Sequence, residues 1–511
     1  MIISKIIKQY GFFVLFFLCV AILSLLFLFP FFSVIIKNFS LSNLIETFSK
    51  PYLYRILLST VRQAFFSTLL SFVIAVLFLL LLINKEFKGK ALFMKVSYLP
   101  FVLPSIVLVL AFVTLFGKNS FLRVDFNILY SLKAVLLSHA FYNFPIIMHS
   151  VYQKYMGMDN SLENVAYTLG ANRIYTFFHV TLRELRGVVL SSLLLVFMYC
   201  FSSFAIVLTL GGGIKNTTLE VEIYKNFKIV NNKVVGTSYA IVSFLIMLFL
   251  MTVYYVLTRN DKKGTVKHIR VLKDGGILCS VFSICASIII LMPLIAILYS
   301  MFFSRARGGK RVSFVLSLKN VFSHYDIFIN TFVVGTLSSM FVVFLSFVIS
   351  EYLYRRNKHD IDTFVFLPLS FSSIALSQGW QSLILNNRIS VMITLSLLHA
   401  LLAFPLVYRI VNNGVRGIEE NTLLSPLTLG ASELYSVFRL DTLIIKSTLK
   451  KALGLAFALS LGEVSGSLVM SSTSFNTLST SIHAYISRYN YSAASIVAVI
   501  LCVIIMLLVK E

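Results

Sequence analysis

Long apolar runs limit the fold of this chain more than any other feature. Residues 12–36 and 65–83 consist almost entirely of hydrophobic side chains, and each run can cross the ~30 Å hydrocarbon layer of a membrane as a helix. The runs are too long for barrel strands and do not alternate between apolar and polar residues. Hydrophobic residues make up 58% of the chain and charged residues only 13%, which leaves too little charge to cover the surface of a soluble protein. The sequence therefore predicts an all-α, polytopic membrane protein surrounded by lipid.

We expect about twelve transmembrane helices, because apolar runs recur along the whole chain. An even number of spans places both termini on one side, and more than half of the 44 Lys and Arg residues then fall on that side. The positive-inside rule identifies it as the cytoplasm. Basic loops also account for the net charge of +24, and no basic run is interleaved with stacking aromatics, so no nucleic-acid partner is expected. The expected spans cover residues 12–36, 65–83, 92–117, 130–151, 186–210, 238–258, 275–302, 329–354, 362–384, 390–411, 446–470 and 490–509.

The chain contains an internal repeat. Residues 167–178 (Tyr-Thr-Leu-Gly-Ala-Asn-Arg-Ile-Tyr-Thr-Phe-Phe) return at an offset of 260 as residues 427–438 (Leu-Thr-Leu-Gly-Ala-Ser-Glu-Leu-Tyr-Ser-Val-Phe). A His-Ala-x-x-x-Phe-Pro unit occurs at 139–145 and again, at the same offset, at 399–405. Six spans per half in one orientation predict two parallel six-helix repeats, related by an axis along the membrane normal. We expect one half over residues 1–258, a polar cytoplasmic linker over 259–274 and the other half over 275–511.

Each copy of the Gly-centred repeat predicts a short helix–turn–helix that projects from the membrane. In the first copy, Glu163 suits the first turn of a helix, and Gly170 permits a tight turn or C-cap. The amphipathic stretch that follows contains Tyr175, Phe177 and Phe178. Such a projection suits docking into a groove on a partner, and a helix lying on the membrane surface has the same pattern. Two copies in register favour docking to a partner with two-fold symmetry.

The first copy resembles the cytoplasmic "EAA" loop of the permease subunits of bacterial binding-protein-dependent ABC importers. The family pattern is Glu-Ala-Ala, three residues, Gly, and nine residues later Ile/Val-x-Leu-Pro. Ala166, Gly170 and the Val-Thr-Leu of residues 180–182 fit this pattern. Asn164 and Val165 stand where Glu-Ala is usual, and the final Pro is missing.

The second copy departs further from the family pattern. It keeps Gly430 and Ala431 but has Leu-Ser-Pro at residues 424–426 and no terminal Leu-Pro. Equal roles for the two loops are therefore not implied.

The resemblance implies a type I importer permease of the MetI-like fold, multi-pass in the bacterial inner membrane with both termini in the cytoplasm. The sequence contains no Gly-x-x-x-x-Gly-Lys-[Ser/Thr] phosphate-binding motif. ATP and Mg would therefore be bound by a separate cytoplasmic ATPase dimer, and this chain would be no enzyme and hold no cofactor or metal. A periplasmic or lipid-anchored binding protein would deliver the substrate. The residues expected to couple the chain to the ATPase are Glu163, Asn164, Ala166, Gly170, Ala171, Gly430, Ala431 and Phe438.

A second stretch points to the substrate. Residues 203–224 (Ser-Phe-Ala-Ile-Val-Leu-Thr-Leu-Gly-Gly-Gly-Ile-Lys-Asn-Thr-Thr-Leu-Glu-Val-Glu-Ile-Tyr) are similar to the end of the fifth span and the following external segment of thiamine permeases. This similarity implies import of thiamine or its phosphate esters. Iron(III) permeases share a looser Thr-Leu-x-x-x-Ile-Tyr, so an iron(III) importer is the alternative within the family.

Two polar positions are candidates for the substrate path. Ser203 opens the thiamine-like stretch, and Glu463 lies inside an expected span, where an unpaired carboxylate is costly. Because thiamine is cationic, Glu463 could favour it on the path; its other interpretation is a carboxylate bonded to neighbouring Ser and Gly groups near an interface. A transporter driven by an ion gradient would also have twelve spans and a parallel repeat. Against that class, the repeated feature is a cytoplasmic loop rather than a broken helix.

Overall fold

The computed structural model describes residues 2–83, 85–117, 128–159, 161–259, 273–304, 312–356, 359–384, 387–471 and 475–508. Almost all secondary structure in this part of the chain is helical, as the sequence predicts. Its α-helices are α1 (Ile2–Asn38), α2 (Leu41–Ser49), α3 (Pro51–Leu82), α4 (Lys90–Val102), α5 (Ser105–Phe116), α6 (Leu132–Met156), α7 (Ser161–Thr168), α8 (Arg173–Thr176), α9 (Leu182–Phe201), α10 (Ala205–Leu210), α11 (Leu219–Tyr224), α12 (Lys233–Arg259), α13 (Gly276–Phe303), α14 (Phe314–Phe322), α15 (Tyr325–Arg355), α16 (Ser373–Gln381), α17 (Arg388–Val415), α18 (Glu420–Thr428), α19 (Glu433–Tyr435), α20 (Thr442–Ile444), α21 (Lys446–Gly462), α22 (Ser465–Met470), α23 (Leu478–Ser487) and α24 (Tyr491–Leu508). Short 3₁₀ or π turns are η1 (Phe177–Thr181), η2 (Ile214–Asn216), η3 (Lys225–Ile229), η4 (His359–Ser370) and η5 (Ser436–Asp441), and two strands, β1 (Lys85–Glu86) and β2 (Lys273–Asp274), pair in parallel.

Within the described residues, nine helices are long and apolar enough to cross a membrane. A tenth candidate is the pair α4 and α5, which is bent by 103° at its break. The break lies at Pro104, which has no N–H to continue the α4 hydrogen-bond ladder. The expected spans 362–384 and 446–470 are each divided between two shorter helices, η4 with α16 and α21 with α22.

The prediction of uninterrupted helices is therefore wrong at these three spans, and the expected span 186–210 is likewise interrupted between α9 and α10. Hydropathy does not detect such breaks because the apolar composition continues across them.

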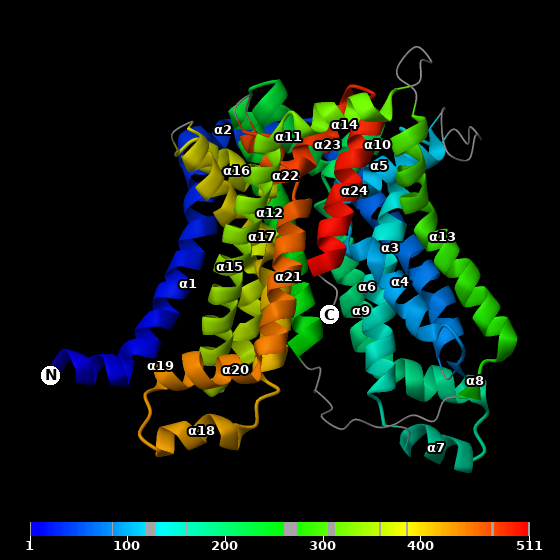
Figure 1. Cartoon of the computed structure of the whole chain (residues 1–511), viewed down its shortest axis with the longest axis vertical. Coiled ribbons are helices and arrows are strands. Elements are labelled where there is room, and N and C mark those ends of the chain that lie inside the picture. Colours follow the sequence, from blue (N-terminus) through cyan, green and yellow to red (C-terminus); the bar gives the residue numbers. More distant parts are fainter. Residues whose placement is uncertain are drawn as a thin grey trace. The chain divides into compact units, whose positions relative to one another are not determined.

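One compact unit contains residues 51–221 and 249–311. Its centre is α3, which packs on α6 and α9. Buried small residues (Thr60, Ala64, Ser67, Thr68, Ser71 and Ala75) form a stripe along α3, and such stripes let membrane helices approach closely. Within this unit, α7 and α8 lie at one end of α6 and α9, while α5 and α10 lie toward the other end (Figure 1).

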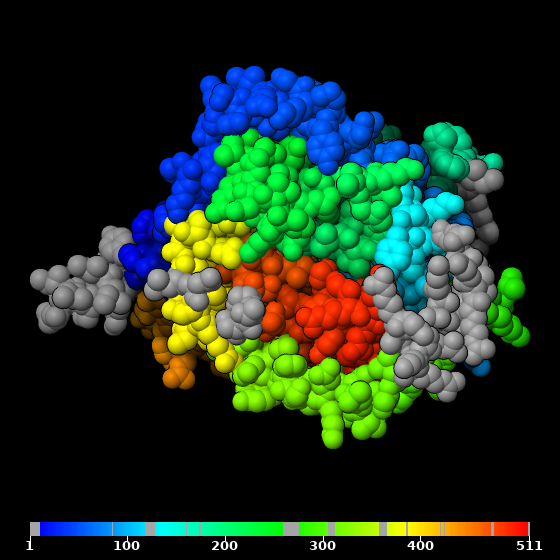
Figure 2. All heavy atoms as spheres, turned by 90° about the horizontal axis from the view of Figure 1, so that it is seen from above, coloured from blue at the N-terminus to red at the C-terminus, as the bar shows by residue number. Residues whose placement is uncertain are grey.

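The other compact unit contains residues 1–50, 222–248 and 312–511. Here α15 takes the central place and packs on α17 and α21, again through buried small residues such as Gly335, Ser339 and Ser346. The segment α18–α20 lies at one end of these helices, and α14, α16 and α23 lie at the other end (Figure 1). At that second end, α22 to α24 (orange to red) lie between α14 (lime green) and α16 (yellow), as Figure 2 shows.

The two compact units do not follow the order of the chain. α1 packs on α15, α16 and α17, whereas α13 packs on α4 and α5, so the first helix of each sequential half belongs to the unit built mainly from the other half. The division into residues 1–258 and 275–511 stays a prediction about the repeated sequence, and the linker expected over 259–274 falls largely outside the described residues.

Candidate functional site

The first Gly-centred segment forms the predicted helix–turn–helix. α7 ends in a turn at Gly170, whose φ of +85° lies in the left-handed region that favours glycine. The Ala171 N–H donates to the Ala166 carbonyl at 3.0 Å, and the Gly170 N–H donates to the Tyr167 carbonyl at 3.0 Å, as in a Schellman C-cap. The chain then continues through α8 and η1 into α9.

The second segment repeats this geometry at the 260-residue offset. Gly430 has a φ of +83°, and the Ala431 N–H donates to the Pro426 carbonyl at 3.0 Å. Pro426 is compatible with this turn because it supplies a carbonyl and needs no N–H. The turn is therefore the same in both halves, although the residues before it differ.

Matching side chains also begin the second helix of each segment. Asn172 accepts from the Tyr175 N–H at 2.8 Å, and Ser432 accepts from the Tyr435 N–H at 3.3 Å. Both are N-caps, for which Asn and Ser are favoured.

Each segment exposes apolar and aromatic side chains around its turn. Leu169 and Leu429, directly before the two glycines, are 82% and 87% exposed. Tyr175 and Tyr435 are exposed at equivalent positions. Exposed apolar groups that rim a turn are typical of a surface that binds another protein.

The predicted coupling residues differ in what they contact. Glu163 is half-buried, and its Oε1 accepts from the Thr181 hydroxyl at 2.7 Å, which joins α7 to η1. Asn164 is exposed, whereas Ala166 is half-buried. Phe438 is 37% exposed and lies beside Phe344 and Phe347 of α15. Phe438 thus has an intramolecular packing role that the sequence did not predict.

Ser203 and Glu463 occupy equivalent places at the 260-residue offset, each at a helix break. Ser203 lies between α9 and α10, and its hydroxyl is 2.7 Å from Nε2 of the buried His139. Glu463 follows the last residue of α21, and its Oε1 accepts from the Ser465 hydroxyl and, at 3.2 Å, from the Gly466 N–H. This carboxylate therefore caps α22, in the geometry of the second interpretation of Glu463.

The repeated histidines hold these breaks. His399 bonds Ser460 of α21 at 2.8 Å and Ser467 of α22 at 3.1 Å, and so connects the two parts of the broken helix. His139 bonds Gln63 at 2.7 Å on its other nitrogen.

Broken helices recur in both units, at Ser203 and at Glu463. The sequence argument that the chain repeats a cytoplasmic loop rather than a broken helix is therefore wrong as evidence against an ion-gradient transporter.

The thiamine-like stretch owes several of its residues to backbone geometry. Gly212 has a φ of +73°, and a Cβ there would lie 2.0 Å from the Tyr130 carbonyl oxygen. Within the same stretch, the Leu219 N–H donates to the Thr60 hydroxyl at 3.0 Å.

This contact has a counterpart in the other unit, where the Leu478 N–H donates to the Thr331 hydroxyl at 2.8 Å. The Thr-Leu pair of this stretch thus recurs at 477–478, a repeat that sequence analysis missed and that the shared Thr-Leu dipeptide could have revealed.

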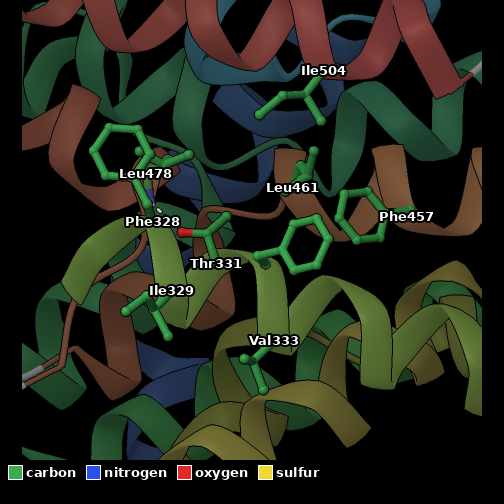
Figure 3. A pocket seen from close by; sticks show the side chains of 9 residues that line it. Phe328, Ile329, Thr331, Val333, Phe457, Leu461, Leu478 and Ile504 are labelled. Atoms are coloured by element: carbon green, nitrogen blue, oxygen red, sulfur yellow. Dashed lines mark hydrogen bonds between the residues drawn. The ribbon is translucent and has the colours of Figure 1, made fainter. Parts of the chain in front are cut away.

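A cavity of about 370 Å³ lies among α15, α21, α23 and α24 (Figure 3). Among the described residues that line it, Thr331 has the only polar side chain, and its hydroxyl is already bonded to Ile327 and Leu478. The cavity offers no group for a charged substrate and suits an apolar chain.

The sequence was also compared with known proteins. Residues 67–262 match the family described as binding-protein-dependent transport system inner membrane component, a range that holds the whole first Gly-centred segment and the stretch 203–224. This match and the relatives described below support an ABC importer permease. The permease is a multi-pass protein of the inner membrane, and its relatives named below are transport proteins rather than enzymes.

The permease is similar to thiamine permeases along most of its length. It is 23% identical to the thiamine transport system permease protein of Escherichia coli over 485 residues, which cover 91% of this chain and 89% of that protein. The thiamine permease of Brucella abortus is 32% identical over 184 residues, 34% of each chain. A probable sulfate transport system permease protein of Prototheca wickerhamii is 28% identical over 235 residues, which are 44% of this chain but 92% of that protein. A nearly complete permease thus matches less than half of this chain, as the internal repeat predicts.

Proposed function

We propose that this permease imports thiamine or a thiamine phosphate ester, which a substrate-binding protein delivers and a separate ATPase dimer drives across the membrane. The observation that carries the coupling is the identical exposed turn at Gly170 and Gly430. Each ATPase subunit would receive one segment, and ATP-driven closure of the dimer would then change the arrangement of the permease. The substrate is supported by the relatives that align along most of the chain, which are thiamine permeases.

This coupling fixes the orientation that we propose. Both Gly-centred segments have to face the cytoplasm to reach an ATPase, which places both termini there as well. The thiamine-like stretch 203–224 would then face the periplasm, where a binding protein docks.

The proposal is tested by reconstituting the permease in proteoliposomes with the proposed ATPase and binding protein. We expect thiamine-loaded binding protein to stimulate ATP hydrolysis and ATP-dependent uptake of labelled thiamine. Ferric ion serves as the matched control. Stimulation by ferric ion alone would transfer the substrate assignment to iron(III), and uptake driven by an ion gradient without ATP would refute the importer.

Glu463→Gln separates the two roles of this carboxylate. Glutamine keeps an oxygen that can accept from Ser465 and Gly466 but has no charge to favour a cation. If Glu463 lies on the substrate path, as we propose, uptake of thiamine should fall about tenfold, equivalent to ~1.4 kcal/mol, while the thermal stability of the purified permease stays unchanged. Wild-type uptake would leave Glu463 with its capping role alone.

A further inference from the structure

A buried ion cluster fixes the second Gly-centred segment to the C-terminal end of α15, here called its foot. The Arg355 guanidinium donates to Asp441 of η5, to the Ser436 hydroxyl at 3.1 Å and to Glu351 at 3.4 Å. The side chains of Arg355, Asp441 and Glu351 are only 6%, 1% and 0% exposed. Charged groups are this deeply buried only when they are paired, so the three residues form one unit.

The two carboxylates depend on a single cation. Among the described residues, Glu351 Oε1 and Asp441 Oδ1 are buried without a hydrogen-bond partner, so Arg355 is the group that compensates their charge there. Burial raises the pKa of the Asp441 carboxyl, and the Arg355 guanidinium opposes that shift. Removal of Arg355 would leave two buried carboxylates facing each other, which strongly favours local opening of the segment.

Further contacts hold the same joint. The Tyr354 hydroxyl donates to the Ile418 carbonyl at 3.0 Å, and Ser350 donates to Asn412 at 3.1 Å. The Phe438 ring packs on Phe347 of α15, which lies about one turn before Glu351. The foot of α15 is therefore bonded both to the end of α17, just before the segment, and to η5 within it.

Among the described residues, the first segment shows no such cluster at the equivalent position. Thr181 stands where Asp441 does at the 260-residue offset, and it bonds Glu163 of α7 instead. In the second copy the residue at the Glu163 position is Leu423. The two copies thus carry their acidic group at different positions. In the first copy Glu163 links two parts of the segment to each other, and in the second Asp441 links the segment to the membrane helix α15.

We propose that Arg355 is a positioning residue that makes the second segment and α15 move as one body. This inference rests on the proposed coupling to an ATPase. A displacement of the segment would pass through Asp441 and Arg355 into α15, and from there into α17 and α21, on which α15 packs. α21 ends at the Glu463 break, so this route joins the segment to the proposed substrate path. The second segment, which has lost more of the family motif, is the one with a buried charge link to its helix.

The test compares Arg355→Met with Arg356→Met in proteoliposomes that contain the ATPase and binding protein. Arg356 is the matched control because it also pairs with the segment, through Glu433 at 3.2 Å, but its side chain is 48% exposed, and exposed pairs contribute little. We expect Arg355→Met to lower the number of thiamine molecules transported per ATP hydrolysed at least fivefold, and Arg356→Met to change it less than twofold. This ratio does not depend on the amount of folded protein, so a merely structural role would not change it.

A triple variant covers the case in which Arg355→Met does not fold. Glu351→Leu, Arg355→Asn and Asp441→Thr together leave no buried charge in this cluster. Each introduces a residue of the first half: Thr181 at the 260-residue offset, and Leu80 and Asn84 at an offset of 271, which also relates Thr331 of α15 to Thr60 of α3. The transport ratio of this variant should fall in the same way. A wild-type ratio in the folded triple variant would overturn the proposal.

Hydrogen exchange of the permease alone provides a readout that needs no ATPase. In Arg355→Met, or in the triple variant, backbone exchange over residues 436–445 should be at least tenfold faster, with no change over residues 177–186. Unchanged exchange over 436–445 would refute the attachment itself. Absence of ATP-driven uptake by the wild-type protein would instead refute the proposed function, and the role of Arg355 in coupling with it.

Discussion

Gly170→Val should abolish uptake while the protein still inserts and accumulates in the membrane. Valine in the left-handed region costs at least about 1–2 kcal/mol, and β-branched residues are especially unfavourable there. Nothing lies within 4 Å of a Cβ at this position, so the effect would come from the backbone and not from a clash. The C-cap would be lost, and Leu169 with the rest of the exposed turn would no longer have the shape that we propose the ATPase binds. Uptake below about a tenth of wild type is expected, measured with labelled substrate in membrane vesicles.

Two matched variants separate this explanation from general damage. Gly276→Val introduces the same strain, at a φ of +65° with open space around the Cβ, but at the start of α13 and outside the coupling segments. It should leave uptake within about twofold of wild type. Gly170→Asn should retain most uptake, because asparagine tolerates the left-handed conformation. Normal uptake in Gly170→Val would count decisively against a docking role for the first segment.

The turns of the two Gly-centred segments were predictable from sequence because their signals are local. A glycine after a short polar helix, an Asn or Ser two residues later and an in-register copy specify the turn without any knowledge of tertiary contacts. The apolar runs likewise predicted where the membrane helices lie. The breaks at Ser203 and Glu463 were not predictable from hydropathy, because they depend on capping groups such as Ser465 and on histidines about 60 residues away.

Contacts between distant parts of the chain were out of reach. Arg355 and Asp441 are 86 residues apart, and no local pattern pairs them. Within the in-register repeat, the trace of this pair is an acidic residue, Asp441, in the second copy where the first has Thr181. The exchange of α1 and α13 between the two compact units has no such trace, because both helices are apolar over nearly their whole length and fit any lipid-covered surface.

The position of α1 depends on a glycine in α16. A Cβ on Gly379 would lie 2.2 Å from the carbonyl oxygen and 2.9 Å from the Cβ of Pro30. Around this contact, Phe27 and Phe31 of α1 lie within 5.0 Å of Phe371, measured between ring centroids. The obstacle to a side chain is backbone, which cannot move aside as a flexible side chain would. Close packing of the two helices therefore requires glycine at this position.

Gly379→Val should detach α1 from α16 and destabilise the permease by about 3 kcal/mol, the upper part of the range for overpacked cores. Gly157→Val is the control, because a Cβ there makes only ordinary contacts of 3.5 Å and longer. Cys19 of α1 reports the detachment directly: it is 1% exposed, so a membrane-permeant maleimide should label it slowly in the wild-type protein and rapidly in Gly379→Val, once the other four cysteines are replaced. Because α1 also packs against α19 of the second segment, uptake should fall together with the protection of Cys19. Unchanged labelling and an unchanged melting temperature in Gly379→Val would show that α1 does not pack on α16 through this contact.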